Sequence, residues 1–143
     1  MNARAVERRA FGRTIGDFSN VQDWMANSRV EIDQARLLVL HAAWRMAHGA
    51  WRMDTQGNAA ARVDVAAIKL VAAQMQTRVL DRAMQVFGAM GLTPDTPLAQ
   101  LLSWGRAMRL QDGPDEVHLR TIARAELARA KAAAGSTSPC LQH

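Results

Sequence analysis

The amino-acid composition predicts an all-α fold. Ala, Leu, Met and Arg are abundant, whereas aromatic residues make up 5% of the 143 residues and Tyr is absent. Ala and residues with straight side chains lose little conformational entropy in a helix. No stretch alternates apolar and polar residues strictly enough to predict a strand. We expect one up-down helical bundle, because this length supports one core and is short for two.

The first element in the chain is predicted to be a short helix. Residues 1–12 allow about two helical turns before Gly12 stops them. Residues 13–19 are expected to form a loop. Since a bundle of the four-helix type needs four whole helices, we expect this segment to be a truncated first helix.

Two long helices form the middle of the predicted bundle. The first runs from about Asn20, a candidate N-cap with Asp23 three residues later, to Gly49 or beyond. Its apolar residues recur at intervals of three and four, which marks one buried face. A turn is expected at 56–58. The second helix, from about 59 to 87, is rich in small residues, which predicts close contacts between helices.

The last third of the chain contains a break and two shorter helices. Residues 88–97 hold two Gly and two Pro and cannot continue a helix. A short helix is predicted over 98–104, with 105–112 unassigned. A final helix is expected from Pro114 to about 134, because Pro suits a first turn and the acids Asp115 and Glu116 suit the positive end of the helix dipole. The bundle thus covers 1–134, followed by a disordered tail over 135–143.

The positive charge is spread along the chain. Sixteen of the 18 basic residues are Arg, and the net charge is +5. Nucleic-acid binding is usually marked by a clustered basic patch or arm. Dispersed Arg on amphipathic helices is more typical of a solvated face with i,i+4 ion pairs. The sequence therefore argues against a nucleic-acid partner.

The single cysteine and the hydropathy limit the remaining classes. Cys140 excludes an intrachain disulfide and argues against a cysteine-based zinc site. Two histidines without a nearby carboxylate pair rarely form a metal site, so no metal is expected. There is no signal peptide pattern and no run of 18 apolar residues. We expect a cytoplasmic protein that does not span a membrane.

Residues 109–124, RLQDGPDEVHLRTIAR, combine a turn with three carboxylates. Asp112, Asp115 and Glu116 fall within five positions around a Gly-Pro pair. Asp-Gly is a common turn dipeptide, so the segment taken alone indicates a turn and a helix start. The alternative is a catalytic carboxylate, and only the surrounding motifs can favour it.

Three separated stretches resemble the C-terminal helical domain of the acyl-CoA dehydrogenase family. They are ERRAFGRTIGDFSNVQ at 7–22, AMQVFGAMGL at 83–92 and LQDGPDEVHLRTIAR at 110–124. EIDQAR at 31–36 and IK at 68–69 add to the likeness, which covers about residues 4–130. The branch that includes acyl-CoA dehydrogenase family members 10 and 11 writes the third motif as Asp-Gly-Pro-Asp-Glu-Val-His, unchanged here at 112–118.

The resemblance implies α,β-dehydrogenation of an acyl-CoA thioester, as in fatty-acid oxidation. A carboxylate removes the α-proton, the β-hydride passes to FAD, and the product is a 2-enoyl-CoA. By position Asp112 is the base, one methylene shorter than the usual Glu. Gly113 would let the backbone approach flavin and thioester closely. Pro114 replaces a usual Thr that contacts the cofactor in many members.

The resemblance also implies an FAD site shared between subunits. Arg8 matches the Arg that reaches the pyrophosphate of a neighbouring subunit's FAD, which suits a planar guanidinium. Phe11 and Gln22 match the adenine end, and Glu116 matches a position near the adenine. The turn that contacts the adenosine half matches Gln85, Val86, Phe87, Gly88 and Ala89.

The resemblance implies acyl-CoA as substrate, and either further copies of the chain in a dimer or tetramer or the missing dehydrogenase domains as protein partners. An electron-transfer flavoprotein is one candidate acceptor, and the sequence leaves the acceptor open. The family's N-terminal helical domain and middle β-domain have no counterpart here, so we expect the chain to be inactive without them. The alternative is a non-catalytic helical oligomerisation module derived from the same family.

Overall fold

The computed structural model describes residues 1–48 and 55–136, and in this part of the chain the fold is all-α with one short hairpin. This confirms the predicted fold class. The α-helices are α1 (Asn2–Glu7), α2 (Ser19–Ala47), α3 (Thr55–Phe87), α4 (Leu98–Met108) and α5 (Asp115–Ser136). The hairpin strands are β1 (Arg9–Ala10) and β2 (Arg13–Thr14), and two 3-10 turns are η1 (Ile15–Asp17) and η2 (Gly88–Leu92).

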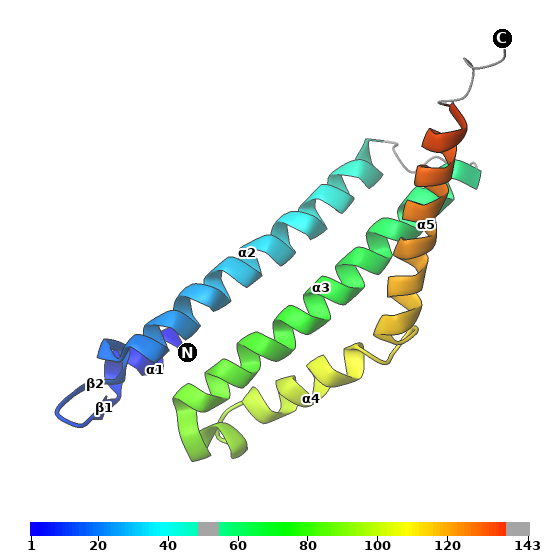
Figure 1. The fold of residues 1–143 in the computed structure, drawn as a ribbon. Helices are drawn as coiled ribbons and strands as arrows, with labels where there is room; N and C mark the ends of the chain where they lie inside the picture. Colours follow the sequence, from blue (N-terminus) through cyan, green and yellow to red (C-terminus); the bar gives the residue numbers. More distant parts are fainter. Residues whose placement is uncertain (49–54, 137–143) are drawn as a thin grey trace, which may run out of the picture.

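The long helix α3 is the centre of the bundle. It packs against α2 along one side and against α4 and α5 along another (Figure 1). The helix α2 runs antiparallel to α3, and α4 followed by α5 returns along α3 with a bend between them (Figure 1). The corner between α4 and α5 therefore faces the middle of α3, far from the N-terminal hairpin.

The N-terminal segment differs from its prediction. The helix α1 ends at Glu7, not at Gly12, and the chain then forms an antiparallel hairpin that pairs Arg9 with Thr14. Phe11 and Gly12 both have positive φ, 52° and 81°, which is the geometry of a two-residue hairpin turn. The Phe-Gly pair therefore marks a hairpin rather than a helix end.

The starts of the two long helices also differ from their predictions. Asn20 does not cap α2, because the helix begins at Ser19 after Phe18. A carboxylate cap forms one turn earlier instead, where Asp17 accepts from the backbone N–H of Thr14 at 2.9 Å and from its hydroxyl at 2.7 Å. The turn expected at 56–58 lies inside α3, since a single Gly in a helix costs only about 1 kcal/mol. Gly49 lies outside the described residues.

The two C-terminal helices are longer than predicted. The helix α4 continues through Gly105, which is buried, and a Cβ there would lie 3.4 Å from the side chain of Gln76 on α3. Glycine thus allows close approach of α4 to α3 instead of ending the helix. The break after Phe87 is confirmed, and α5 starts directly after Pro114. It extends to Ser136, and 137–143 lie outside the described residues.

The core of the bundle is built mainly from small side chains. Ala35 and Ala42 of α2 and Ala66 and Ala73 of α3 are each at most 4% exposed. Small side chains let helix backbones approach closely, as the composition of α3 predicted. Among the described residues, no large side chain is fully buried.

Candidate functional site

The corner between α4 and α5 carries Asp112 in an unusual backbone conformation. Asp112 has φ 52° and Gly113 has φ 99°, so two successive residues lie in the left-handed region. Asp is one of the few side chains that visits this region, and Gly does so without strain. The Asp112 side chain is exposed to solvent. The corner therefore presents one carboxylate outward from a turn with a defined shape.

The helix α3 holds this turn through Lys69. Its ammonium Nζ donates to the backbone carbonyl of Gln111 and to that of Gly113, the latter at 3.2 Å. The ring Nε2 of His118, on the first turns of α5, lies 3.4 Å from the same ammonium. The turn that carries Asp112 is thus attached to the middle of the bundle by one cation.

The second carboxylate of the motif, Asp115, has a structural role. It is 7% exposed and accepts from Arg109, at 2.6 Å to Nη2 and 2.8 Å to Nε, and from Gln74 Nε2 at 3.2 Å. Burial by itself raises the pKa of Asp115. The hydrogen bonds from Arg109 and Gln74, with the charges of Arg109 and Arg106, outweigh burial and hold that pKa below its usual value. Asp115 is therefore an ionised anchor for the start of α5.

The predicted residues of the N-terminal stretch lie at the opposite end of α3. Arg8 follows the last residue of α1 and is exposed. Phe11 forms the tip of the hairpin, 94% exposed, with its ring edge-on to Phe18 at 6.3 Å. The side-chain amide of Gln22 donates to the Gly16 carbonyl at 2.9 Å. Gln22 thus braces the turn before α2.

The end of α3 meets this hairpin region. Val86 packs in a small hydrophobic cluster with Ala5 and Val21, and Phe87 lies against it with the Arg4 guanidinium 5.5 Å from its ring centroid. Val86 is buried, so it supports the packing of this end and is not exposed to a ligand. Within residues 85–89, Gln85, Gly88 and Ala89 are exposed.

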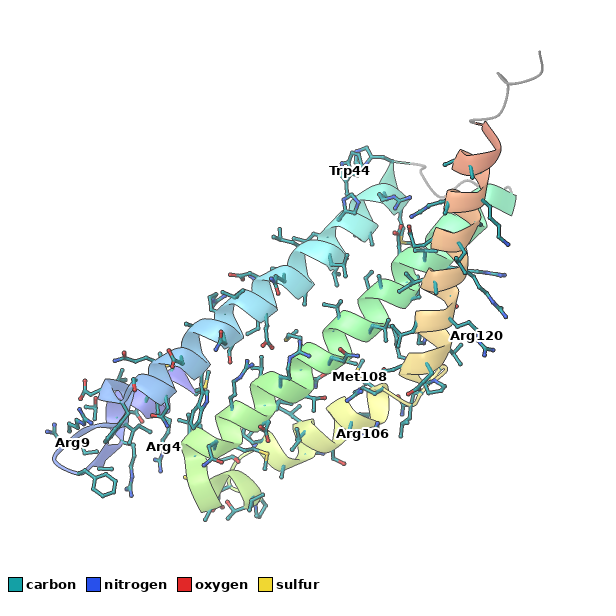
Figure 2. All side chains as sticks on the ribbon, in the orientation of Figure 1. Arg4, Arg9, Trp44, Arg106, Met108 and Arg120 are labelled. Carbon is teal, nitrogen blue, oxygen red and sulfur yellow. The ribbon has the colours of Figure 1, made fainter. Side chains whose placement is uncertain are left out.

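The structure therefore brings the predicted site residues together in two groups. One contains Arg8, Phe11, Gln22 and the residues 85–89. The other contains Asp112, Gly113 and the exposed Glu116. Lys69 and Gln85, one near each group, are 16 residues apart on α3, or about 24 Å at 1.5 Å per residue. Figure 2 shows Arg4 and Arg9 at the hairpin end, and Arg106 and Arg120 on the two helices that flank the corner.

Sequence reasoning missed the residues that support the corner. Gln74 and Arg109 were not singled out, and Lys69 appeared only as part of a family-like dipeptide. A signal for Lys69 is nevertheless present, because it is the one charged residue in the run 65–73, VAAIKLVAA. An apolar cavity of about 260 Å³ adjoins it, lined by Val65, Ile68, Lys69, Ala72, Ala73 and Met108.

Residues 1–48 and 55–136 lack two further kinds of site. This part of the chain holds no cluster of three or more His, Cys, Asp or Glu side chains that could bind a metal ion. None of its helices combines the length and the apolar character needed to cross a bilayer.

Comparison with known proteins identifies close relatives of the chain. Residues 1–127 match the family described as "Acyl-CoA dehydrogenase, C-terminal domain". The probable acyl-CoA dehydrogenase FadE2 of Mycobacterium tuberculosis is 55% identical over 128 residues, which cover 90% of this chain and 30% of that protein. Acyl-CoA dehydrogenase family member 10 of Mus musculus is 49% identical over 127 residues, 89% of this chain and 11% of that protein.

Solved structures show the same helical arrangement. A structure from Mycobacterium abscessus that is assigned to the acyl-CoA dehydrogenases has a TM-score of 0.80 and 42% identity, covering 90% of this chain and 30% of that one. The FAD complex of PigA has a TM-score of 0.77 and 25% identity, covering 90% of this chain and 31% of that one. The chain thus spans less than a third of each of these four proteins.

Proposed function

The chain belongs to the acyl-CoA dehydrogenase family, and we propose that it is the C-terminal domain of a flavin-dependent member. The whole enzyme would oxidise acyl-CoA thioesters between their α and β carbons. The activity would belong to the whole enzyme, of which this chain is less than a third by comparison with its relatives. We therefore expect no turnover from the chain alone.

Asp112 is the base in this proposal. The observation that carries it is the contrast within the motif, in which Asp115 is occupied by Arg109 and Gln74 while Asp112 is exposed on a fixed turn. The Asp112 carboxylate takes the α-proton, and the electron pair left on the α-carbon forms the new double bond as a hydride leaves the β-carbon. FAD, when bound, supplies the acceptor for that hydride.

The hairpin end has the chemistry to hold an anionic dinucleotide. Arg8, Arg9 and Arg13 are all exposed there, beside the exposed ring of Phe11. A guanidinium group can donate two parallel hydrogen bonds to phosphate oxygens, and an aromatic ring can stack on a base. The exposed Gln85, Gly88 and Ala89 would complete the adenosine side. Gln85 and Lys69, which lies beside the Asp112 turn, are about 24 Å apart along α3. This separation supports a site shared between two copies of the chain.

Self-association is supported by a second observation. On α2 the exposed residues Val30, Leu37, Leu40 and Trp44 recur at intervals of seven, three and four. This places them on one stripe, opposite the buried residues Val21, Ser28, Ala35 and Ala42. An apolar stripe of this kind marks an interaction surface. A non-catalytic oligomerisation module would share this property, so the stripe does not separate the two functions.

Substitution of Asp112 tests the proposal. Asp112→Asn keeps the size of the side chain but removes the base, so kcat in the assembled flavin-loaded enzyme should fall about 100-fold or more. The flavin absorbance, recorded for each variant after desalting, should not change. Asp33→Asn on α2 is the matched control and should keep full activity. Full turnover by Asp112→Asn would show that the base assignment is wrong.

A further inference from the structure

The face of α3 toward the α4–α5 corner carries one ammonium group in an apolar surround. A charge on such a face is costly unless its donors are used. Lys has three N–H donors and no acceptor. Three acceptors face Lys69 Nζ, namely the carbonyls of Gln111 and Gly113 and the ring Nε2 of His118. The donor capacity of Lys69 is therefore matched by groups of the corner.

Two of these acceptors flank the candidate base. The Gln111 carbonyl belongs to the peptide unit just before Asp112, and the Gly113 carbonyl belongs to the unit after Gly113. The left-handed φ values of 52° and 99° lie between these two units. Because Lys69 bonds to both, it restrains the backbone on each side of Asp112 at once.

The other link between α3 and the corner acts elsewhere. Gln74 and Arg109 bond to the side chain of Asp115, which anchors the first turn of α5. These bonds do not involve the peptide units on either side of Asp112, which Lys69 contacts instead. The hydrogen bonds that restrain those two units from α3 thus come from a single side chain.

We propose that Lys69 is a positioning residue that acts through the backbone of the 111–113 turn to aim the Asp112 carboxylate at its substrate. The catalytic meaning of this inference rests on the function proposed above. The restraint itself is a property of this chain and can be measured without activity.

Hydrogen exchange on the chain tests the restraint. The reporter amides are those of Leu110, Gln111 and Val117, which bond within the corner at 2.9, 3.0 and 2.9 Å. The Lys69→Met side chain has a similar length but no hydrogen-bond donors. In this variant the reporter amides should exchange at least about tenfold faster. Lys69→Arg restores donors and should recover most of the protection.

Two controls separate the restraint from general destabilisation. Lys131→Met changes the other lysine, exposed on α5, and should leave the reporter amides unchanged. The Ile15 amide, bonded to the Arg8 carbonyl at 2.8 Å in the hairpin region, should stay protected in Lys69→Met. Unchanged exchange at the corner, or equal acceleration at Ile15, would overturn the proposal.

Kinetics in the assembled enzyme test the positioning role. Lys69→Met should lower kcat at least about tenfold with little change in KM, and Lys69→Arg should recover it. If Asp112→Asn is inactive while Lys69→Met keeps its kcat, the positioning role is wrong and the base assignment stands. If Asp112→Asn stays active, the base assignment fails and with it the aiming role, whereas exchange still decides the restraint.

Discussion

At the scale of single residues, three acids of one motif have three different environments. Asp112 is exposed on a turn with left-handed backbone conformation. Asp115 is buried and accepts hydrogen bonds, and Glu116 is exposed on the first turn of α5. Burial costs a carboxylate its hydration unless donors replace it. For Asp115, hydrogen bonds from Arg109 and Gln74 take the place of water, and they tie that residue to the fold. Asp112 keeps its carboxylate available for a ligand.

The lowered pKa of Asp115 predicts an acid-sensitive contribution to stability. Because the folded-state pKa lies below the ordinary value of 3.8, the contribution is complete above that value and is lost as the pH falls through the folded pKa. Asp115→Asn should lower the free energy of unfolding by roughly 1–3 kcal/mol at pH 7. Urea titration should show that difference shrinking as the pH falls below about 4.

The control for this prediction is another carboxylate on the same helix. Glu126 pairs with Arg129 one turn away, and both side chains are exposed. Exposed pairs of this kind contribute little. Glu126→Gln should therefore leave the urea midpoint nearly unchanged at both pH values. A loss in Asp115→Asn that did not depend on pH would contradict an ionised Asp115.

At the scale of elements, the packing of α2 on α3 depends on small side chains at regular intervals. The buried residues of α2 are Val21, Ser28, Ala35 and Ala42, spaced by seven. A seven-residue spacing keeps one narrow stripe in contact with a neighbouring helix. Glu31 of α2 joins the same contact through Arg82 at 2.7 Å and Arg78 at 3.0 Å. Close helix approach and ion pairs thus act together.

Enlarging one of these small residues should separate the helices. Ala35 is 4% exposed, so Ala35→Leu forces extra atoms into a filled contact and should cost about 1–3 kcal/mol. Thermal unfolding measured by circular dichroism should show a lower midpoint. Ala43→Leu, at an exposed position of the same helix, is the control and should have a small effect. Equal midpoints for the two variants would show that the contact tolerates larger side chains.

At the scale of the whole molecule, large apolar side chains lie mostly outside a core of small ones. Among the described residues, the buried apolar set consists mainly of alanines, while Leu37, Leu40, Trp44 and Trp104 are each more than half exposed. Figure 2 shows Trp44 near the C-terminal end of α2. Burying such side chains gains about 1.5–3 kcal/mol each, which favours association over exposure. These exposed side chains are the surface that the proposed self-association would cover.

Charge placed on the α2 stripe should break self-association. We expect the purified chain to sediment as a dimer or tetramer. The double variant Leu37→Glu with Leu40→Glu should shift it to the monomer, because two carboxylates would have to be buried. The control is Asn27→Glu with Ala43→Glu, which adds the same charge at two exposed positions of α2 outside the stripe. A monomeric wild-type chain in sedimentation velocity would contradict the prediction.

Local properties of the sequence determined the fold class and the order of the helices. Low aromatic content, abundant Ala and Leu and the 3.6-residue period predicted helices, and two Gly and two Pro placed the break after Phe87. The motif at 112–118 also predicted the turn and the start of α5. These features depend on near neighbours in the chain, which is why a single sequence can reveal them.

Contacts between distant segments decided the rest. Only the tertiary structure separates Asp112 from Asp115, because Gln74 reaches Asp115 from 41 positions away and Lys69 reaches the 111–113 turn from more than 40. The tertiary structure also decides that Gly105 stays within α4, because α3 occupies the space that a side chain at residue 105 would need. Sequence patterns do not specify such contacts, because the free energy that selects them arises only when the helices pack.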